Sequence, residues 1–547
     1  MICLFVRGGK YYLLVLVMSV LFLVKTNAQQ ASFPLGKHFF LQFEQQLNSL
    51  NNAHTSFKPL KRSLLKPSAI QLPLFNDKPN LKNWLKRKLL TEHLFIFKGN
   101  DYRVIASQII NFSKGKEIIT KQGTYINTRG FLIEGELGEG LSFFSSFTEN
   151  QAVFPAYIHT YILNHKVVPG QGYARSFKKN GFDYAMSSGH VTIQVLKNSI
   201  IQFGHGKHFI GDGYRSLLLS DNAFNYPYLK VQTTFDCWQY TNLYAEFQDI
   251  NSFLVNDSYD NMGYAKKYMS AHYLSINVSD QLNLALYQTV IVNKEGEHGF
   301  LNGNYLNPLS LLLNTEFNKV TSEHLLLGTT TKYKLPFNAY IYAQTVFSGF
   351  SENNWKFDWW QNRFGYQLGC KIFNFFGVEN LTLQAEYNFV RPYTYAHDNP
   401  QQNYAHYNQP LAHPLGANFA EFLVLSTYKW KRWEIDAKLI SAQYGDEIKG
   451  ESTSYGNDLF MSTGDYADQG AVGSGRPSDF GIKIFQGSLT TVNLKMFNLA
   501  YIINPKTNLK INLGITLRDL ESEESKMQTQ FIDFGIFSDL FNHYYDI

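Results

Sequence analysis

Apolar and polar residues alternate with a period of two through most of the sequence after about residue 102. Between residues 509 and 517, Leu and Ile occupy every second position, and Lys, Asn, Gly and Thr stand between them. The same spacing recurs at 381–389, 339–347 and 532–536. Because successive side chains of a β-strand point to opposite faces, these segments predict strands with one apolar and one polar face.

Short turns and long connections separate these predicted strands in alternation. The turns at 504–506, 334–337 and 429–432 are tight. The long connections lie at roughly 151–181, 206–226, 294–322, 391–418 and 444–487. This arrangement predicts a transmembrane antiparallel β-barrel of about 18 strands, with long loops outside and tight turns at the periplasm. A soluble sandwich or propeller is the alternative, but no repeat of 40–50 residues marks propeller blades.

The first 28 residues have the pattern of a secretory signal peptide. Arg7 and Lys10 precede an apolar run at 11–24, and Ala28 provides a small residue for cleavage. The run is too short for a membrane-spanning helix, so cleavage after Ala28 and export are expected. The predicted location is the cell outer membrane.

Residues 29–100 form a separate predicted unit, and residues 101–547 form the barrel. Phe40, Phe43, Leu47 and Leu50 recur at helical spacing, and a second apolar series with basic neighbours follows residue 80. Two or three amphipathic helices are therefore expected in a small periplasmic segment. This segment has 11 basic and 3 acidic side chains, a charge of +8. The basic run could contact anionic lipid or a polyanion, but a solvated helix face is the favoured explanation.

Charge and composition sharpen this division. The total of +5 combines +3 in residues 1–28 and +8 in residues 29–100, so residues 101–547 have a charge of −6. The chain has 45 Phe, 35 Tyr and 7 Trp, a content that disordered chains lack. Some of these aromatics fall near predicted strand ends and are expected to form interfacial girdles. These girdle residues are Trp359, Trp360, Tyr366, Trp430, Trp433, Tyr544 and Tyr545.

Cysteine usage predicts no disulfide framework. Cys237 and Cys370 remain after removal of a signal peptide that contains Cys3. One bridge between them is possible, but free thiols are expected, because buried Cys behaves as a small hydrophobic residue.

The segment 202–229 carries most of the candidate chemistry. It combines four glycines with basic, acidic and aromatic side chains between two predicted strands. The candidate contacts for a polysaccharide or polyanion are His205, Lys207, His208, Asp212, Tyr214, Arg215, Asp221 and Asn222. A structural loop that caps the barrel lumen explains the segment equally well. Zinc held by His205, His208 and Asp212 is a weaker alternative, because no thiol or third His completes the set.

Catalysis is not expected. Glu134 and Glu136 share a face of one predicted strand and could serve glycoside cleavage, but acidic residues also line polar lumens. The sequence lacks a G-x-S-x-G nucleophile elbow. No enzyme activity, metal or cofactor is therefore predicted.

The stretch from Gly204 to Asn222, glycine-rich and then Leu-rich with a closing Asn, resembles the signature region of the Wzi-type capsule-assembly barrels. The stretch from His413 to Phe419 and the aromatic richness resemble the Bacteroidetes family of gliding motility protein RemB. These resemblances imply a monomeric barrel of about 18 strands with a helical periplasmic piece. They also imply a part in surface-polysaccharide organisation or in gliding, and neither family supplies catalytic residues.

Three classes of function therefore remain. The favoured one is a non-enzymatic outer-membrane barrel that supports gliding motility or polysaccharide organisation. The alternative is a porin or substrate-specific channel, and the third is a barrel enzyme. Expected partners are outer-membrane lipid and surface polysaccharide or motility proteins, and no nucleic acid is indicated.

Overall fold

The structure is a computed structural model. It describes residues 31–50, 53–65, 82–138, 140–254, 263–293, 305, 307–308, 323–349, 358–464 and 475–547. The predicted signal peptide and most of the 294–322 connection lie outside these residues. Within them, no helix has the length and apolar character needed to cross a membrane.

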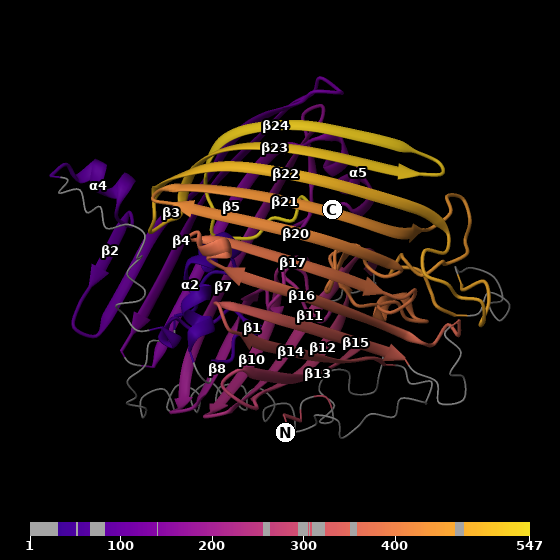
Figure 1. The fold of residues 1–547 in the computed structure, drawn as a ribbon, viewed down its shortest axis with the longest axis horizontal. Coiled ribbons are helices and arrows are strands. Elements are labelled where there is room, and N and C mark those ends of the chain that lie inside the picture. The colour runs from indigo at the N-terminus through magenta and orange to yellow at the C-terminus, as the bar shows by residue number, and fades with distance from the viewer. Residues whose placement is uncertain are drawn as a thin grey trace, which may run out of the picture.

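A closed antiparallel barrel of 18 strands forms the body of the molecule (Figure 1), as the alternating pattern predicted. The barrel closes where the last strand pairs with the first. Residues 531–537 of β24 lie antiparallel to residues 117–111 of β3. The strands are β3 (Tyr102–Glu117), β4 (Gly123–Leu137), β5 (Leu141–Val153), β7 (Gly181–Leu196), β8 (Ser199–Gly206), β10 (Tyr226–Phe235), β11 (Trp238–Leu254), β12 (Gly263–Asn277), β13 (Leu282–Asn293), β14 (His324–Leu335), β15 (Ala339–Gly349), β16 (Arg363–Phe373), β17 (Leu381–Val390), β20 (Phe419–Trp430), β21 (Trp433–Asp446), β22 (Ser488–Asn504), β23 (Leu509–Ser522) and β24 (Lys526–Ser538).

The alternation predicted for residues 509–518 appears directly in β23. Ile511, Leu513, Ile515 and Leu517 are between 38% and 43% exposed on the outer face, whereas Lys510, Thr516 and Arg518 on the other face are buried. An apolar outer face combined with a polar inner face is the arrangement of a barrel surrounded by lipid.

The tight turns lie where the sequence predicted them. Strands β14 and β15 are joined by residues 336–338, and β22 and β23 by residues 505–508. Between β20 and β21 only Lys431 and Arg432 remain outside the strands, fewer than the four residues predicted. The aromatic pair beside that turn, Trp430 and Trp433, is 55% and 40% exposed, as expected for a girdle.

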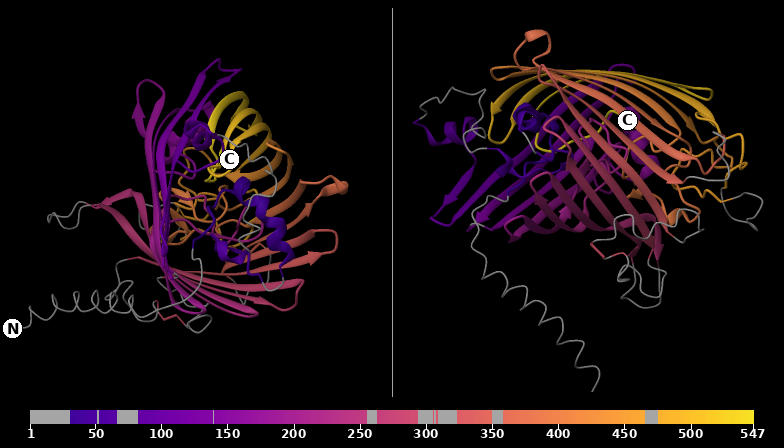
Figure 2. Two further views of the ribbon diagram at one scale, coloured as in Figure 1. Left: turned by 90° about the vertical axis from the view of Figure 1, so that its left-hand side faces the viewer. Right: turned by 60° about the horizontal axis from the view of Figure 1, so that its bottom comes forward.

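The lumen is occupied by segments from both ends of the chain (Figure 2). Residues 31–50 and 53–65, here called the plug segment, contain helix α2 (Lys37–Ser49), strand β1 (Phe57–Lys58) and a turn of 3-10 helix at Arg62–Leu64. Phe43 and Leu47 of α2 are buried, as their helical spacing predicted.

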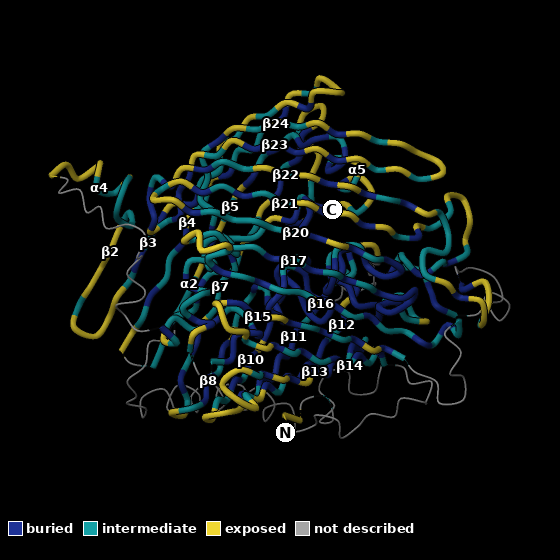
Figure 3. Tube along the Cα trace, viewed as in Figure 1, coloured by how far each residue is buried: buried dark blue, intermediate teal, exposed yellow. Residues whose placement is uncertain are grey.

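Loops from the opposite side enter the same space. Residues 207–225 between β8 and β10 form the inner loop, which contains β9 (Phe209–Ile210). The 391–418 loop contains β18 (Ala405–His406) and β19 (Gln409–Pro410). Figure 3 shows buried residues gathered in the segments inside the barrel, and alternating burial along the strands.

One further segment projects from the barrel and pairs with its wall, and a second, after β5, packs against the last residues of the chain. Helix α4 (Trp84–Leu90) and β2 (Phe95–Lys98) project at one end (Figure 1), and β2 pairs with the part of β3 that extends past β24. The long connection after β5 contains α5 (Ala156–His165) and β6 (Arg175–Phe177). Strand β2 thus lies within residues 29–100, for which only helices were predicted.

The C-terminal end differs from its prediction. The final strand was expected to run to residue 541, with Tyr544 and Tyr545 in an interfacial girdle. Instead β24 ends at Ser538, and residues 539–547, here called the tail, turn into the lumen. Tyr544 is 3% exposed there, so it is an interior residue. Trp360 is also buried, under the guanidinium of Arg476, whose Cζ lies 4.0 Å from its ring.

Candidate functional site

The inner loop holds the candidate residues in the middle of the lumen. Its strand β9 pairs with β1 of the plug segment, so Phe57 lies opposite Ile210. The side chains of Leu217, Leu218 and Leu219 are fully buried in an apolar cluster with residues of the 391–418 loop. The Leu-rich end of the loop is therefore an anchor that packs the loop inside the barrel.

Asp212 joins the inner loop to the plug segment and to the wall. Its carboxylate accepts hydrogen bonds from Thr55 at 2.9 Å and Ser56 at 2.5 Å, and Lys332 of β14 lies 3.3 Å away. Burial alone would raise the pKa of this carboxyl, but Lys332 and Lys58 hold it well below its usual range. Asp212 is therefore a charged cross-link between three parts of the chain.

Arg215 forms the centre of a second buried network. Its guanidinium donates to Glu421 of β20 at 3.1 Å and to the Asp546 carboxylate at 3.3 Å. The hydroxyl of Tyr214 donates to the Asp546 carboxylate at 2.6 Å, and the ammonium of Lys438 of β21 lies 2.6 Å from the same carboxylate. Burial alone would raise the pKa of Asp546, but Arg215 and Lys438 hold it well below its usual range. The tail is thereby fixed inside the barrel.

The remaining candidates make contacts of the same kind. Lys207 donates to the carbonyl oxygens of Gly170 and Asp221, at 2.5 Å and 3.0 Å. The Asp221 carboxylate accepts from Tyr544 of the tail at 2.5 Å. Asn222 donates to a carbonyl of the 391–418 loop, at Pro410 and 3.2 Å.

The two histidines of the segment face different surroundings. Nδ1 of His205 lies 3.2 Å from the carbonyl oxygen of Ser187. His208 is fully buried, with its ring edge-on to Tyr228 at 4.4 Å, and its Nε2 has no partner among the described residues. In the described part of the chain, His205, His208 and Asp212 do not bring ligand atoms within reach of one ion, so the zinc alternative has no support from the geometry.

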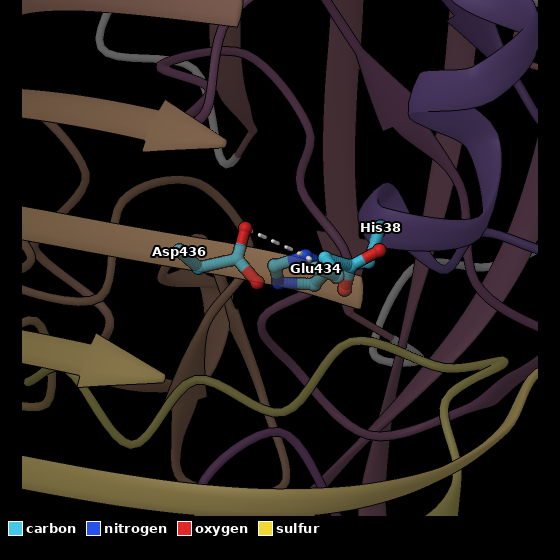
Figure 4. A group of neighbouring side chains, drawn as sticks. All are labelled: His38, Glu434 and Asp436. Atoms are coloured by element: carbon cyan, nitrogen blue, oxygen red, sulfur yellow. Dashed lines mark ion pairs between the residues drawn. The ribbon is translucent and has the colours of Figure 1, made fainter. Parts of the chain in front are cut away.

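Helix α2 is tied to the wall by charges. Glu44 pairs with Lys371 of β16 at 2.8 Å and accepts from Tyr340 of β15 at 2.6 Å. At its first turn, His38 lies 3.7 Å from Glu434 and 3.5 Å from Asp436 of β21 (Figure 4).

The group formed by His38, Glu434 and Asp436 has ligand atoms within 4.8 Å of one another, a spacing compatible with a metal ion. However, Lys429 and Lys510 both pair with Glu434. A cation would have to displace two ammonium groups from that carboxylate. The group is better explained as an ion-pair cluster that holds α2 against the wall.

Cavities remain between the plug segment and the wall. One of 220 Å³ is lined by residues of both, including Arg62, Glu134, Glu136 and His190. Glu134 and Glu136 thus share a face, as predicted. Arg62 binds Glu134 through two hydrogen bonds of 2.9 and 2.8 Å, which makes this carboxylate an ion-pair partner. Cys237 and Cys370 are free thiols, the expected alternative to a bridge.

Comparison with solved structures supports the architecture. The chain is similar to Wzi from Escherichia coli, an outer-membrane carbohydrate-binding β-barrel involved in group 1 capsule assembly, with a TM-score of 0.52. The match covers 93% of this chain and 99% of Wzi at 12% sequence identity. The chain has the fold of an outer-membrane β-barrel.

Weaker similarity extends to barrels of Pseudomonas aeruginosa. OprD matches with a TM-score of 0.41 and 10% identity, and OccK3 with 0.39 and 9%. Each match covers 79% of this chain and 94% of the other. No protein-family model matches the sequence, and no curated protein does. The similarity to Wzi at this identity establishes the fold alone, and the resemblance to gliding-motility barrels stays a prediction.

The structure also contains functional residues that sequence reasoning missed. Glu421, Lys332, Lys438 and Asp546 complete the networks around the inner loop. A signal for the first three was present, because they are charged residues at alternating positions of predicted strands and must face a polar lumen. Their partners could not be found in the same way, since each contact joins residues more than a hundred positions apart.

Proposed function

We propose that this protein is a plugged, non-enzymatic outer-membrane barrel that organises cell-surface polysaccharide or supports gliding motility. The observation that carries the proposal is the occupied lumen. The plug segment, the inner loop and the tail lie inside the barrel and are held by buried ion pairs, and the 391–418 loop packs on the leucines of the inner loop. A channel needs a continuous aqueous path, whereas a surface-organising barrel needs a rigid support for its outer loops.

Polysaccharide contact is proposed for the rim formed by the long loops. The polar atoms of Asp212 and Arg215 are engaged inside the protein, so they are poorly placed for a polymer outside. At the rim, Trp359 and Phe480 form an aromatic pair with ring centroids 4.7 Å apart, and Phe480 is 44% exposed. Exposed aromatic faces offer apolar surface together with a polar edge, a combination that suits the C–H faces and hydroxyls of sugars.

Conductance in planar bilayers tests the plugged state. Purified wild-type protein is expected to give far smaller and rarer current steps than an open barrel of similar size. The double variant Glu44→Gln, Asp212→Asn removes two links of the plug segment and should increase channel opening. Stable large channels in the wild type would instead support the porin alternative.

Genetics separates the two proposed roles. Deletion of the gene is expected to reduce either polysaccharide retention or colony spreading, and complementation with the wild type should restore it. Loss of polysaccharide with normal spreading would favour polysaccharide organisation, and the reverse would favour motility. Complementation with Trp359→Ala, Phe480→Ala is expected to fail for polysaccharide retention. A deletion strain normal in both respects would contradict the proposal.

A further inference from the structure

The ammonium groups of two lysines of the lumen, Lys230 and Lys61, have no hydrogen-bond or ion-pair partner among the described residues. Lys230 of β10 is 2% exposed, and among the described residues its ammonium makes no hydrogen bond or ion pair. Its ammonium lies over the ring of Phe57, 5.9 Å from the ring centroid. By contrast, Lys332, Lys371 and Lys510 each pair with a carboxylate.

Lys61 of the plug segment adds a second positive charge to the same region. Its charge acts on Lys230, and no carboxylate of the described residues pairs with its ammonium. The neighbouring Arg62 is neutralised by Glu134, which it binds at 2.8 Å. The plug segment and β10 therefore each contribute an amine without a carboxylate partner among the described residues.

Histidine side chains complete the surroundings of Lys230. His208 is fully buried with its ring 5.6 Å from Phe57, the ring that Lys230 also contacts, and its Nε2 has no partner among the described residues. His190 of β7 lies opposite Gly204, which in turn lies opposite Tyr228 of β10. His190 and Tyr228 both line the cavity of 220 Å³.

Gly204 lies between His190 and Tyr228 across the three strands, where the backbone leaves no room for a side chain. A Cβ atom on Gly204 would lie 2.6 Å from the Cβ atom of His190, so only glycine leaves room between the two strands at this level. The cavity thus adjoins β10 at Tyr228, which lies two positions from Lys230 on the same face of the strand.

Burial of an ammonium without a counter-charge is strongly unfavourable, and folded proteins normally pair such groups or bind an ion there. Charge-assisted hydrogen bonds from ammonium groups, together with a hydrogen bond from a neutral imidazole N–H, suit a carboxylate or a phosphate. We propose that Lys230, Lys61 and His208 form a binding site for a small oxyanion, either a carboxylate such as that of an acidic sugar or a phosphate. This site does not depend on the proposed function, because a purified barrel would bind the anion whether or not it organises polysaccharide.

Thermal unfolding of the purified full-length protein in detergent tests the site. The probes are inorganic phosphate, glucuronate and, as a neutral sugar, glucose, all at one ionic strength. The wild type is expected to gain thermal stability in a saturable way with at least one anion, and to show no response to glucose. A response to glucuronate alone would indicate an acidic saccharide, and an equal response to both anions would indicate free oxyanions.

Variants assign the effect to the site. Lys230→Met should bind the effective anion at least tenfold more weakly, and without anion it should unfold at a temperature no lower than that of the wild type. Lys61→Met should also weaken binding, and it replaces Lys230→Met in the experiment if Lys230→Met does not fold. Lys179→Met removes a charge from an exposed position and should leave affinity unchanged. Equal affinity in Lys230→Met and wild type, no response to either anion, or an equal response to glucose would overturn the proposal.

Discussion

Replacing Arg215 by Met tests whether the inner loop is an internal cross-link. Arg215 and its two acidic partners, Glu421 and Asp546, each have a side chain only 1% exposed, so solvent does not screen their interaction. Removal of one partner from a buried ion pair typically costs about 3–5 kcal/mol, because a charge is left without compensation.

The remaining contacts set where in that range the effect falls. Without Arg215, Glu421 keeps His413 at 2.8 Å and Asp546 keeps Lys438 at 2.6 Å. Both carboxylates therefore stay partly compensated, and the loss in unfolding free energy should be near the lower end, about 3 kcal/mol.

Denaturation of the detergent-solubilised protein by guanidinium, followed by tryptophan fluorescence, measures the change. The exposed Arg175→Met variant is the matched control and should stay within about 0.5 kcal/mol of the wild type. The double variant Arg215→Met, Glu421→Gln should lose less than the sum of the single losses, because the two side chains interact. If Arg215→Met were as stable as Arg175→Met, the cross-linking role of the loop would be refuted.

Two further predictions follow from the plug segment and from the β7–β8 contact. Burial lowers the pKa of His38, but Asp436, Asp539 and Glu434 raise it above its usual value. Protonated His38 thus stabilises the folded state below about pH 6.5, and this contribution is lost as the pH rises through the raised pKa. The unfolding midpoint should fall more between pH 6 and pH 8.5 in the wild type than in His38→Gln, and parallel curves would contradict this. A Cβ atom on Gly204 would lie 2.5 Å from the carbonyl oxygen of Gly189, so Gly204→Ala should lose about 1–3 kcal/mol in the same denaturation assay. Gly123→Ala, whose Cβ would meet nothing within 4 Å, should be nearly neutral, and equal stability of the two variants would rule out the close approach.

The tail shows where local sequence patterns failed. Aromatic residues near a strand end suggested an interfacial girdle, and this was right for Trp430 and Trp433. It was wrong for Tyr544, which lies in the lumen and donates to Asp221. The same residue type serves lipid interfaces and buried hydrogen bonds, so only the path of the chain distinguishes the two.

The sequence by itself determined the barrel, because a period of two records which face of each strand meets lipid and which meets the lumen. It also located the inner loop as the segment richest in candidate chemistry. What that loop contacts was decided by the tertiary structure alone. Arg215 meets Glu421 and Asp546 only because barrel closure brings together residues 206 and 331 positions apart, and no periodicity in a sequence records such pairings.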